Sequence, residues 1–158
     1  MPVTAAQFFL RRGWFIRAGA ETAYPASVLS FYLEQLRRCD SEIADKRILL
    51  FGYGGRFDLA IGLLESVAAH VVVCDQLTEP DHRHNAGLLS RFPQYLEEVG
   101  GRVVPHEARI TTLHNDIRKA DRLDRVDIVL SNSVFEHLRD LPGVTETLAR
   151  LTHSNGIQ

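Results

Sequence analysis

Cysteine is scarce in this sequence, which contains only Cys39 and Cys74. The two residues lie far apart and fit neither a Cys-x-x-Cys pair nor the spacing of a zinc site. Cys74 also closes an apolar segment, residues 71–74 (VVVC). We therefore expect two reduced thiols in a cytoplasmic protein.

An excess of positive charge is also missing. The chain has a net charge of −2 and a pI of about 6.4, so no overall basic field attracts it to nucleic acid or to an anionic membrane. No apolar run approaches the roughly 18 residues of a membrane span. We expect no nucleic-acid partner and no membrane association.

Clustered metal ligands are absent as well. The segment Asp81-His-Arg-His84 offers potential ligands, but no further cluster of cysteine or histidine lies at a suitable spacing. We predict that this segment is a solvated loop and that the chain has no metal site.

The sequence does contain a glycine-rich turn between two apolar segments. Residues 47–51 (RILLF) precede Gly52-Tyr-Gly-Gly55, and residues 59–64 (LAIGLL) resume the apolar pattern. This order predicts a buried parallel strand, a tight turn and a packed helix. Glycine lets a ligand approach the backbone, and the N–H groups that open the helix favour polar or anionic ligand groups. The alternative is a plain strand-to-helix turn.

Asp75 is the second candidate residue of a nucleotide site. It ends the apolar segment 71–75, roughly 20 residues past the glycines, where an acidic residue can accept hydrogen bonds from both ribose hydroxyls of an adenosine. The alternative is that Asp75 caps a turn.

The apolar spacing predicts the other elements. Helices are expected from Pro25, over 56–69, over 88–99 with Gly100-Gly101 as its end, and from Pro142 to Asn155-Gly156. Strands are expected at 47–51, 71–75 and 127–131. A third strand lies within 102–114, with 109–113 favoured over 102–104.

Strands that alternate with helices predict a doubly wound parallel α/β sheet in one domain, residues 1–158. It comprises an N-terminal helical segment, 1–44, and an α/β core, 45–158. Ligands bind such sheets outside the carboxyl ends of the strands. The turns at Gly52, Asp75, Asn115-Asp116 and Ser131-Asn132 should therefore share one rim.

These segments together resemble a known family. The order ILLFGYGG, VVVCDQ, HNDI and VDIVLSNSVFEHL, followed by an amphipathic helix and Asn-Gly, is similar to the class I S-adenosylmethionine-dependent methyltransferases of the small-molecule type. The resemblance covers about residues 45–158, and residues 127–137 (DIVLSNSVFEH) carry it most specifically. It implies a Rossmann-like fold, S-adenosyl-L-methionine as the cofactor and methyl transfer to a small-molecule acceptor.

The resemblance also implies roles for single residues. Gly52, Tyr53 and Gly54 would pass under the methionine moiety of the donor, and Asp75 would hold the ribose hydroxyls. Gly55 and Gln76 would line the same site.

Two further segments would complete the donor site. The resemblance implies that Asp116 accepts from the adenine amino group, with Ile117 against the ring. Asn132 and Ser133 would border the methyl-donor site. Asp116 is alternatively a helix N-cap.

The resemblance has three departures. Leu50 stands where the family usually has an acidic residue, and Arg56 follows Gly-x-Gly-Gly where a third glycine is usual. The fold normally has seven strands, whereas this chain ends where a fifth would begin. We therefore expect a donor-binding half without the C-terminal strands, an uncovered edge on strand 127–131, self-association through that edge and little methyl transfer.

His137 is the candidate proton acceptor, for an acceptor that loses a proton during attack. The alternative is a partly buried helix residue. Glu136 has a structural interpretation, because Ser133-x-x-Glu136 is a capping box in which the two side chains bind free N–H groups at a helix start.

Two other function classes stay open. One is an NAD(P)-dependent oxidoreductase, although Phe57 occupies the last position of Gly-x-Gly-x-x-Gly. The other is a non-catalytic nucleotide-binding or interaction domain.

Overall fold

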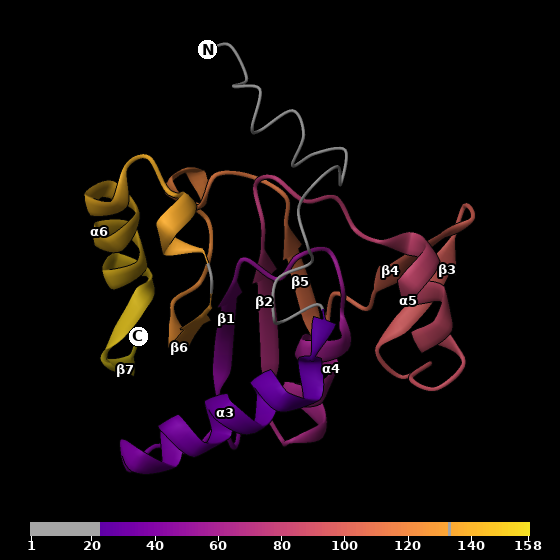
Figure 1. Cartoon of the computed structure of the whole chain (residues 1–158), viewed down its shortest axis with the longest axis horizontal. Helices are drawn as coiled ribbons and strands as arrows, with labels where there is room; N and C mark the ends of the chain where they lie inside the picture. The colour runs from indigo at the N-terminus through magenta and orange to yellow at the C-terminus, as the bar shows by residue number, and fades with distance from the viewer. Residues whose placement is uncertain (1–22, 133) are drawn as a thin grey trace.

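The computed structural model describes residues 23–132 and 134–158 (Figure 1). Its centre is a five-stranded sheet in the order β5-β2-β1-β6-β7, with every neighbouring pair parallel. The strands are β1 (Arg47–Phe51), β2 (His70–Cys74), β5 (Ile110–Leu113), β6 (Val126–Ser131) and β7 (Thr152–Ile157). This sheet confirms the predicted α/β class, and strands 47–51 and 109–113 lie within a residue of their predicted bounds.

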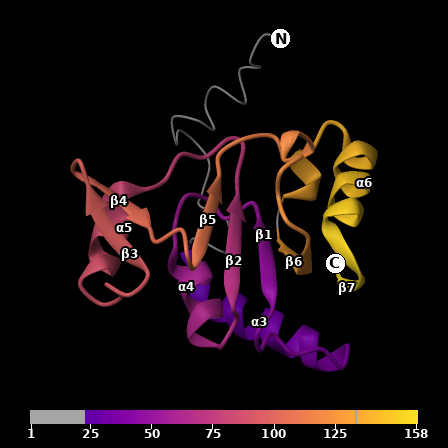
Figure 2. The same ribbon diagram turned by 180° about the vertical axis from the view of Figure 1, so that it is seen from behind.

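The central strands are apolar because both faces of the sheet are covered. In β1, Ile48 and Leu50 pack into one apolar cluster, and Leu49 and Phe51 pack into the other. Helices α3 (Pro25–Arg38) and α4 (Asp58–Glu65) cover the first face, and α6 (Leu141–Leu151) covers the second (Figures 1 and 2). α3 follows the helix predicted from Pro25, whereas α4 is shorter than the predicted 56–69.

The segment predicted as a helix over 88–99 folds differently. Helix α5 (His82–Leu89) ends early, and β3 (Leu96–Val99) pairs antiparallel with β4 (Arg102–Pro105). Gly100 and Gly101 form the tight turn of this hairpin, with φ of 59° and 75°. Two positive φ angles are what a two-residue hairpin turn needs, so the glycines turn a strand instead of ending a helix.

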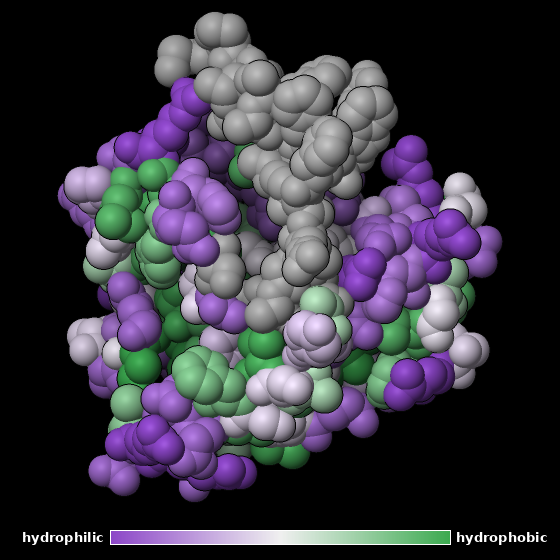
Figure 3. All heavy atoms as spheres, viewed as in Figure 1, coloured by the Kyte–Doolittle hydropathy of each residue, from purple (hydrophilic) through white to green (hydrophobic). Residues whose placement is uncertain are grey.

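The unit of α5 and the hairpin lies beside the edge strand β5 in both ribbon views (Figures 1 and 2). Figure 3 shows mainly hydrophilic residues on its outer side. Asp81 is the N-cap of α5, and its side chain accepts from the N–H of His84. The predicted solvated loop at 81–84 is therefore wrong, because Asp81 provides the cap that starts a helix there.

The sheet continues beyond β6. β7 pairs with β6 at Thr152 and Ile157, so β6 lies between β1 and a fifth strand. The expected uncovered edge on residues 127–131 is thus wrong at its start, where Ile128 pairs with Ile157, whereas the pairing found in the described part of the chain does not extend to residues 129–131. Self-association through this edge stays a prediction. Asn155 and Gly156 lie within β7 and do not end α6, which stops at Leu151.

The described residues contain two free cysteines, as predicted. Burial raises the pKa of the Cys74 thiol to about 12, so this thiol is held in its neutral form. Within the described ranges, no helix is long and apolar enough to span a membrane. The N-terminal helical segment predicted for 1–44 is described only from residue 23, where α3 confirms its last part.

Candidate functional site

The glycine turn follows β1 directly and has a left-handed backbone throughout its glycines. Gly52, Gly54 and Gly55 have φ of 87°, 69° and 80°. The N–H of Gly52 donates to the carbonyl of Cys74 at 2.7 Å, which continues the β1–β2 ladder into the turn. Residues with a Cβ rarely adopt these angles, so the turn needs its glycines whether or not a ligand binds.

Asp75 connects this turn to the loop after β2. Its Oδ2 accepts from the N–H of Gly54 at 3.1 Å, and its Oδ1 accepts from the N–H groups of Leu77 and Thr78, both at 2.9 Å. The capping role of Asp75 is therefore confirmed. A carboxylate has about four acceptor positions, so one position beyond these three bonds can accept a ligand hydroxyl. Its predicted role toward ribose remains a prediction.

A fully buried amide on α5 holds the far side of the turn. Asn85 is 0% exposed, and its Nδ2 donates to the carbonyl of Gly55 at 3.0 Å. Its Oδ1 accepts from the N–H of Phe57 at 3.1 Å. The turn is therefore fixed by a residue about 30 positions away in the sequence, and sequence analysis missed it.

One ion pair and two further polar contacts add to this connection between the turn and α5. Arg56 pairs with Asp81 at 3.2 Å, the N–H of Asp81 donates to the carbonyl of Gly55 at 2.8 Å, and His84 Nε2 lies 2.6 Å from Asp58. Burial opposes ionisation of Asp81, but hydrogen bonds from His84 and Arg56 outweigh it and lower the pKa of Asp81. Arg56, which departs from the family pattern, thus has a structural role in the turn.

Tyr53 is a core residue of the turn. It is 1% exposed and stacks on Phe57, with ring centroids 5.8 Å apart. Burial, followed by the charge of Asp75, raises the pKa of Tyr53, so its hydroxyl stays protonated. That hydroxyl has no hydrogen-bond partner in the described part of the chain.

Asp116 lies at the third segment of the rim, after β5. Its side chain caps the short 3₁₀ helix η1 (Ile117–Lys119) by accepting from the N–H of Arg118, which confirms the N-cap alternative. The Arg118 guanidinium also binds Asp116, at 2.6 Å, and reaches Asp140 at 2.5 Å. These hydrogen bonds from Arg118 lower the pKa of Asp116. Ile117 is 2% exposed and packs in the core, and its predicted contact with adenine remains a prediction.

The fourth segment follows β6. The hydroxyl of Ser131 is buried without a hydrogen-bond partner among the described residues, and Asn132 is half-buried. Ser133 lies outside the described residues. Val134 packs directly on the turn, because a Cβ on Gly52 would overlap its Cγ2.

His137 ends the 3₁₀ helix η2 (Phe135–His137) on the same rim. Its side chain is 61% exposed and lies 3.9 Å from Glu136, so the alternative of a partly buried helix residue is wrong. The N-cap position of η2 is Val134 and not Ser133, so the geometry differs from the proposed capping box.

No family model matches the sequence, and no curated protein matches it significantly. Solved structures do match. A methyltransferase from Thiobacillus denitrificans in complex with S-adenosyl-L-homocysteine superposes with a TM-score of 0.58 at 14% identity over 99% of this chain. Magnesium protoporphyrin IX methyltransferase from Synechocystis PCC 6803, with bound S-adenosylmethionine, gives 0.56 at 15% identity over 93%.

The chain has the class I methyltransferase fold. A coclaurine N-methyltransferase bound to N-methylheliamine and S-adenosylhomocysteine also shares this fold, with a TM-score of 0.55 at 12% identity over 84% of this chain. The chain spans 55%, 65% and 34% of the lengths of these three proteins.

The methyltransferase fold brings the predicted segments to one rim. Gly52–Gly55, Asp75, Asp116 and Asn132 all follow carboxyl ends of parallel strands, and the exposed Gln76 follows Asp75. Sequence analysis missed Asn85, Arg118 and Val134. Of these three, only Asn85 could have been found from the sequence, because it is a polar residue between Asp81, which caps α5, and Leu88, which is buried.

Proposed function

We propose that this chain is the donor-binding part of an S-adenosylmethionine-dependent methyltransferase. The observation that carries the proposal is the hydrogen bond from Gly54 N–H to Asp75 Oδ2 within this fold. It fixes the glycine turn and the acid at the tip of β2 beside each other, as an adenosyl ligand that contacts both would require.

The residues of the rim fit such a ligand at its ribose end. Asp75 keeps one acceptor position beyond its three bonds to backbone N–H groups. At the methionine end of the ligand, Val134 covers Gly52, so the side chain of Val134 would have to move when the donor binds. At the adenine end, Arg118 binds the Asp116 carboxylate, so the ring would have to share Asp116 with Arg118.

The bound donor supplies an activated methyl group on a sulfonium. The chain's own task is then alignment and exclusion of water. Gly52, Gly54 and Asp75 would orient the donor, and Asn132 and Ser133 would border its reactive end. His137 is exposed enough to receive a proton from an acceptor hydroxyl.

We further propose a small-molecule acceptor, because the residues after β6 resemble methyltransferases of that type. The NAD(P) alternative loses support, since Phe57 is 0% exposed and stacks in the core where a dinucleotide turn has its third glycine. A non-catalytic domain is favoured by one observation, the cover of Val134 over Gly52.

A thermal-shift screen tests the proposal, because a ligand that binds the native state raises its melting temperature. We expect S-adenosylhomocysteine and S-adenosylmethionine to raise it, and NAD and NADP to leave it unchanged. A homocysteine-release assay with candidate acceptors then separates an enzyme from a binding domain. A shift with NAD and none with S-adenosylhomocysteine would reverse the assignment.

A further inference from the structure

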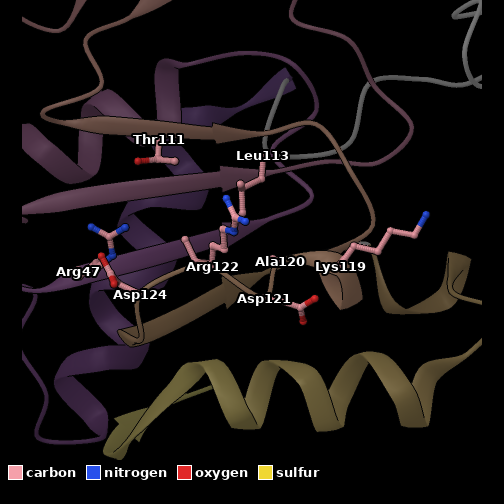
Figure 4. Close-up of a pocket in the computed structure, with 9 residues that line it drawn as sticks. Arg47, Thr111, Leu113, Lys119, Ala120, Asp121, Arg122 and Asp124 are labelled. Carbon is pink, nitrogen blue, oxygen red and sulfur yellow. The ribbon is translucent and has the colours of Figure 1, made fainter.

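A hollow lies on the sheet face that carries α6, and it extends from Arg47 at the start of β1 to Leu113 at the end of β5. Its volume is about 430 Å³, within the range of small-molecule sites. Three parts of the chain line it: the start of β1, strand β5 and the loop between η1 and β6 (Figure 4). Its cationic side chains are those of Arg47, Lys119 and Arg122.

Arg47 has an unsatisfied hydrogen-bond donor at the hollow. Its Nε is buried and has no hydrogen-bond acceptor among the described residues. The nearby carboxylate of Asp127 is already used, because it accepts from the backbone N–H of Arg47 at 2.8 Å and lies 4.0 Å from Lys46. A buried N–H without an acceptor is costly, and a ligand oxygen that accepts from this Nε would remove that cost.

The charge of Arg47 acts on its neighbour across the sheet. His70 pairs with Arg47 in the β1–β2 register, and burial, followed by the charge of Arg47, lowers the pKa of His70. His70 cannot neutralise Arg47, since its Nε2 bonds to the hydroxyl of Thr111 at 2.9 Å and its Nδ1 to the carbonyl of Ala108 at 3.3 Å. The positive charge therefore remains available to a ligand.

The lining carries more positive than negative charge. Arg47, Lys119 and Arg122 take part in none of the ion pairs found in the described part of the chain. Of the two acids, Asp121 lies 4.0 Å from Arg150 and points away from Arg122 in Figure 4. Asp124 alone remains beside Arg47, so two or more cations lack a counter-charge.

The rest of the lining is apolar. Leu113 comes from β5, and Ala120 and Leu123 come from the loop. A purely inorganic anion would leave this surface uncovered. We propose that this hollow binds a small organic anion, with its carboxylate or phosphate on Arg47 and Arg122 and its apolar body against Leu113 and Leu123.

This site does not depend on the proposed methyl transfer. None of its lining residues is one that the proposed donor site uses, and the two sites come nearest at η1, which contains Lys119 and begins at Ile117 after its cap Asp116. A ligand held here should therefore bind whether or not the rim binds an adenosyl ligand.

Phenyl phosphate is a suitable probe, because it has both an anionic group and an apolar ring. Inorganic phosphate lacks the ring and benzyl alcohol lacks the anionic group, so these two compounds serve as comparisons. NMR titration of the ¹⁵N-labelled chain follows the amides of Arg47 and residues 119–124. We expect saturable shifts there with phenyl phosphate, weaker binding of inorganic phosphate and none of benzyl alcohol. Excess S-adenosylhomocysteine should not compete.

Variants assign the binding to the arginines. Arg47→Gln and Arg122→Gln should each weaken phenyl phosphate binding about tenfold, whereas Arg125→Gln, an exposed position outside the lining, should not. Arg122 is exposed, so its substitution tests the site even where Arg47→Gln lowers stability. The proposal is overturned by equal binding of benzyl alcohol, by competition with S-adenosylhomocysteine, by no saturable binding, or by full affinity in Arg122→Gln.

Discussion

The N–H of Gly54 donates a hydrogen bond to Oδ2 of Asp75 across 3.1 Å, and this bond joins the turn after β1 to the tip of β2. The other oxygen of Asp75 is held by Leu77 and Thr78. Asp75 is therefore both a cap of its own loop and a fixed acceptor at the rim. Both roles follow from one carboxylate with more acceptor positions than backbone donors.

Replacing Asp75 tests both roles. Asp75→Ala should weaken binding of S-adenosylhomocysteine by about 1.5–3 kcal/mol, the usual value of hydrogen bonds to a charged group, as measured by calorimetry. It should also lower the melting temperature, because three N–H groups lose their acceptor. Asp75→Asn keeps one oxygen acceptor and should keep more of the stability than of the affinity. Unchanged affinity in both variants would mean that Asp75 only caps its turn.

Asn85 should control the turn from a distance. Asn85→Ala leaves the buried Phe57 N–H without its acceptor, which costs about 1–3 kcal/mol. The Gly55 carbonyl loses one of its two donors and keeps the bond from the N–H of Asp81. We expect a lower free energy of unfolding in urea and weaker binding of S-adenosylhomocysteine. Arg83→Ala, an exposed position on the same helix, is the matched control and should change neither. Normal stability of Asn85→Ala would contradict this account of the turn.

The contact between Val134 and Gly52 gives a paired prediction. Gly52→Ala should be destabilised by at least about 1–2 kcal/mol, because its φ is 87° and its new Cβ would overlap Val134. Val134→Ala removes the overlap and uncovers the turn, so it should partly rescue Gly52→Ala and should bind S-adenosylhomocysteine at least as tightly as the unmodified chain. A Val134→Ala variant with weaker binding would show that Val134 supports the ligand and does not cover its site.

The pair of Asp116 with Arg118 should make the folded chain less stable in acid. Hydrogen bonds from Arg118 lower the pKa of Asp116 below the usual 3.8, so the folded state binds this proton less readily than the unfolded state. The stabilisation is therefore present above about pH 3.8 and disappears as the pH falls through the lowered value. Arg118→Gln should shrink this acid-dependent part, seen as a flatter curve of melting temperature as the pH falls from about 3.8 through the lowered value. An identical curve in the variant would exclude the Arg118–Asp116 pair as its source.

The sequence was most informative where both faces of an element are buried. Strands β1, β2 and β6 each contain a run of three or four apolar residues, and the order of these runs with the glycine turn and Asp75 predicted the sheet and the rim. It failed for the hairpin, because Tyr95, Leu96 and Val99 also fit a helical spacing and Gly100-Gly101 serves equally to end a helix or to turn a strand. β7 was missed because residues 152–157 (THSNGI) are largely polar and exposed, so its pairing with β6 leaves little apolar pattern.

The contacts that hold the site were less predictable than the site itself. Asn85 acts through partners that only the fold brings close, because Gly55 and Phe57 belong to another strand-helix unit. Arg118 pairs with Asp116 two positions earlier and with Asp140, which the fold brings to it. A spacing rule identifies a glycine turn and an acid at a strand tip, but it does not show that a second carboxylate, Asp116, is already paired with Arg118.

Isothermal titration of the chain with S-adenosyl-L-homocysteine tests the central claim most directly. We predict saturable one-to-one binding that Asp75→Ala weakens by about 1.5–3 kcal/mol, with no heat from NAD or NADP under the same conditions. Absence of binding by S-adenosyl-L-homocysteine, or binding of NAD in its place, would contradict the account.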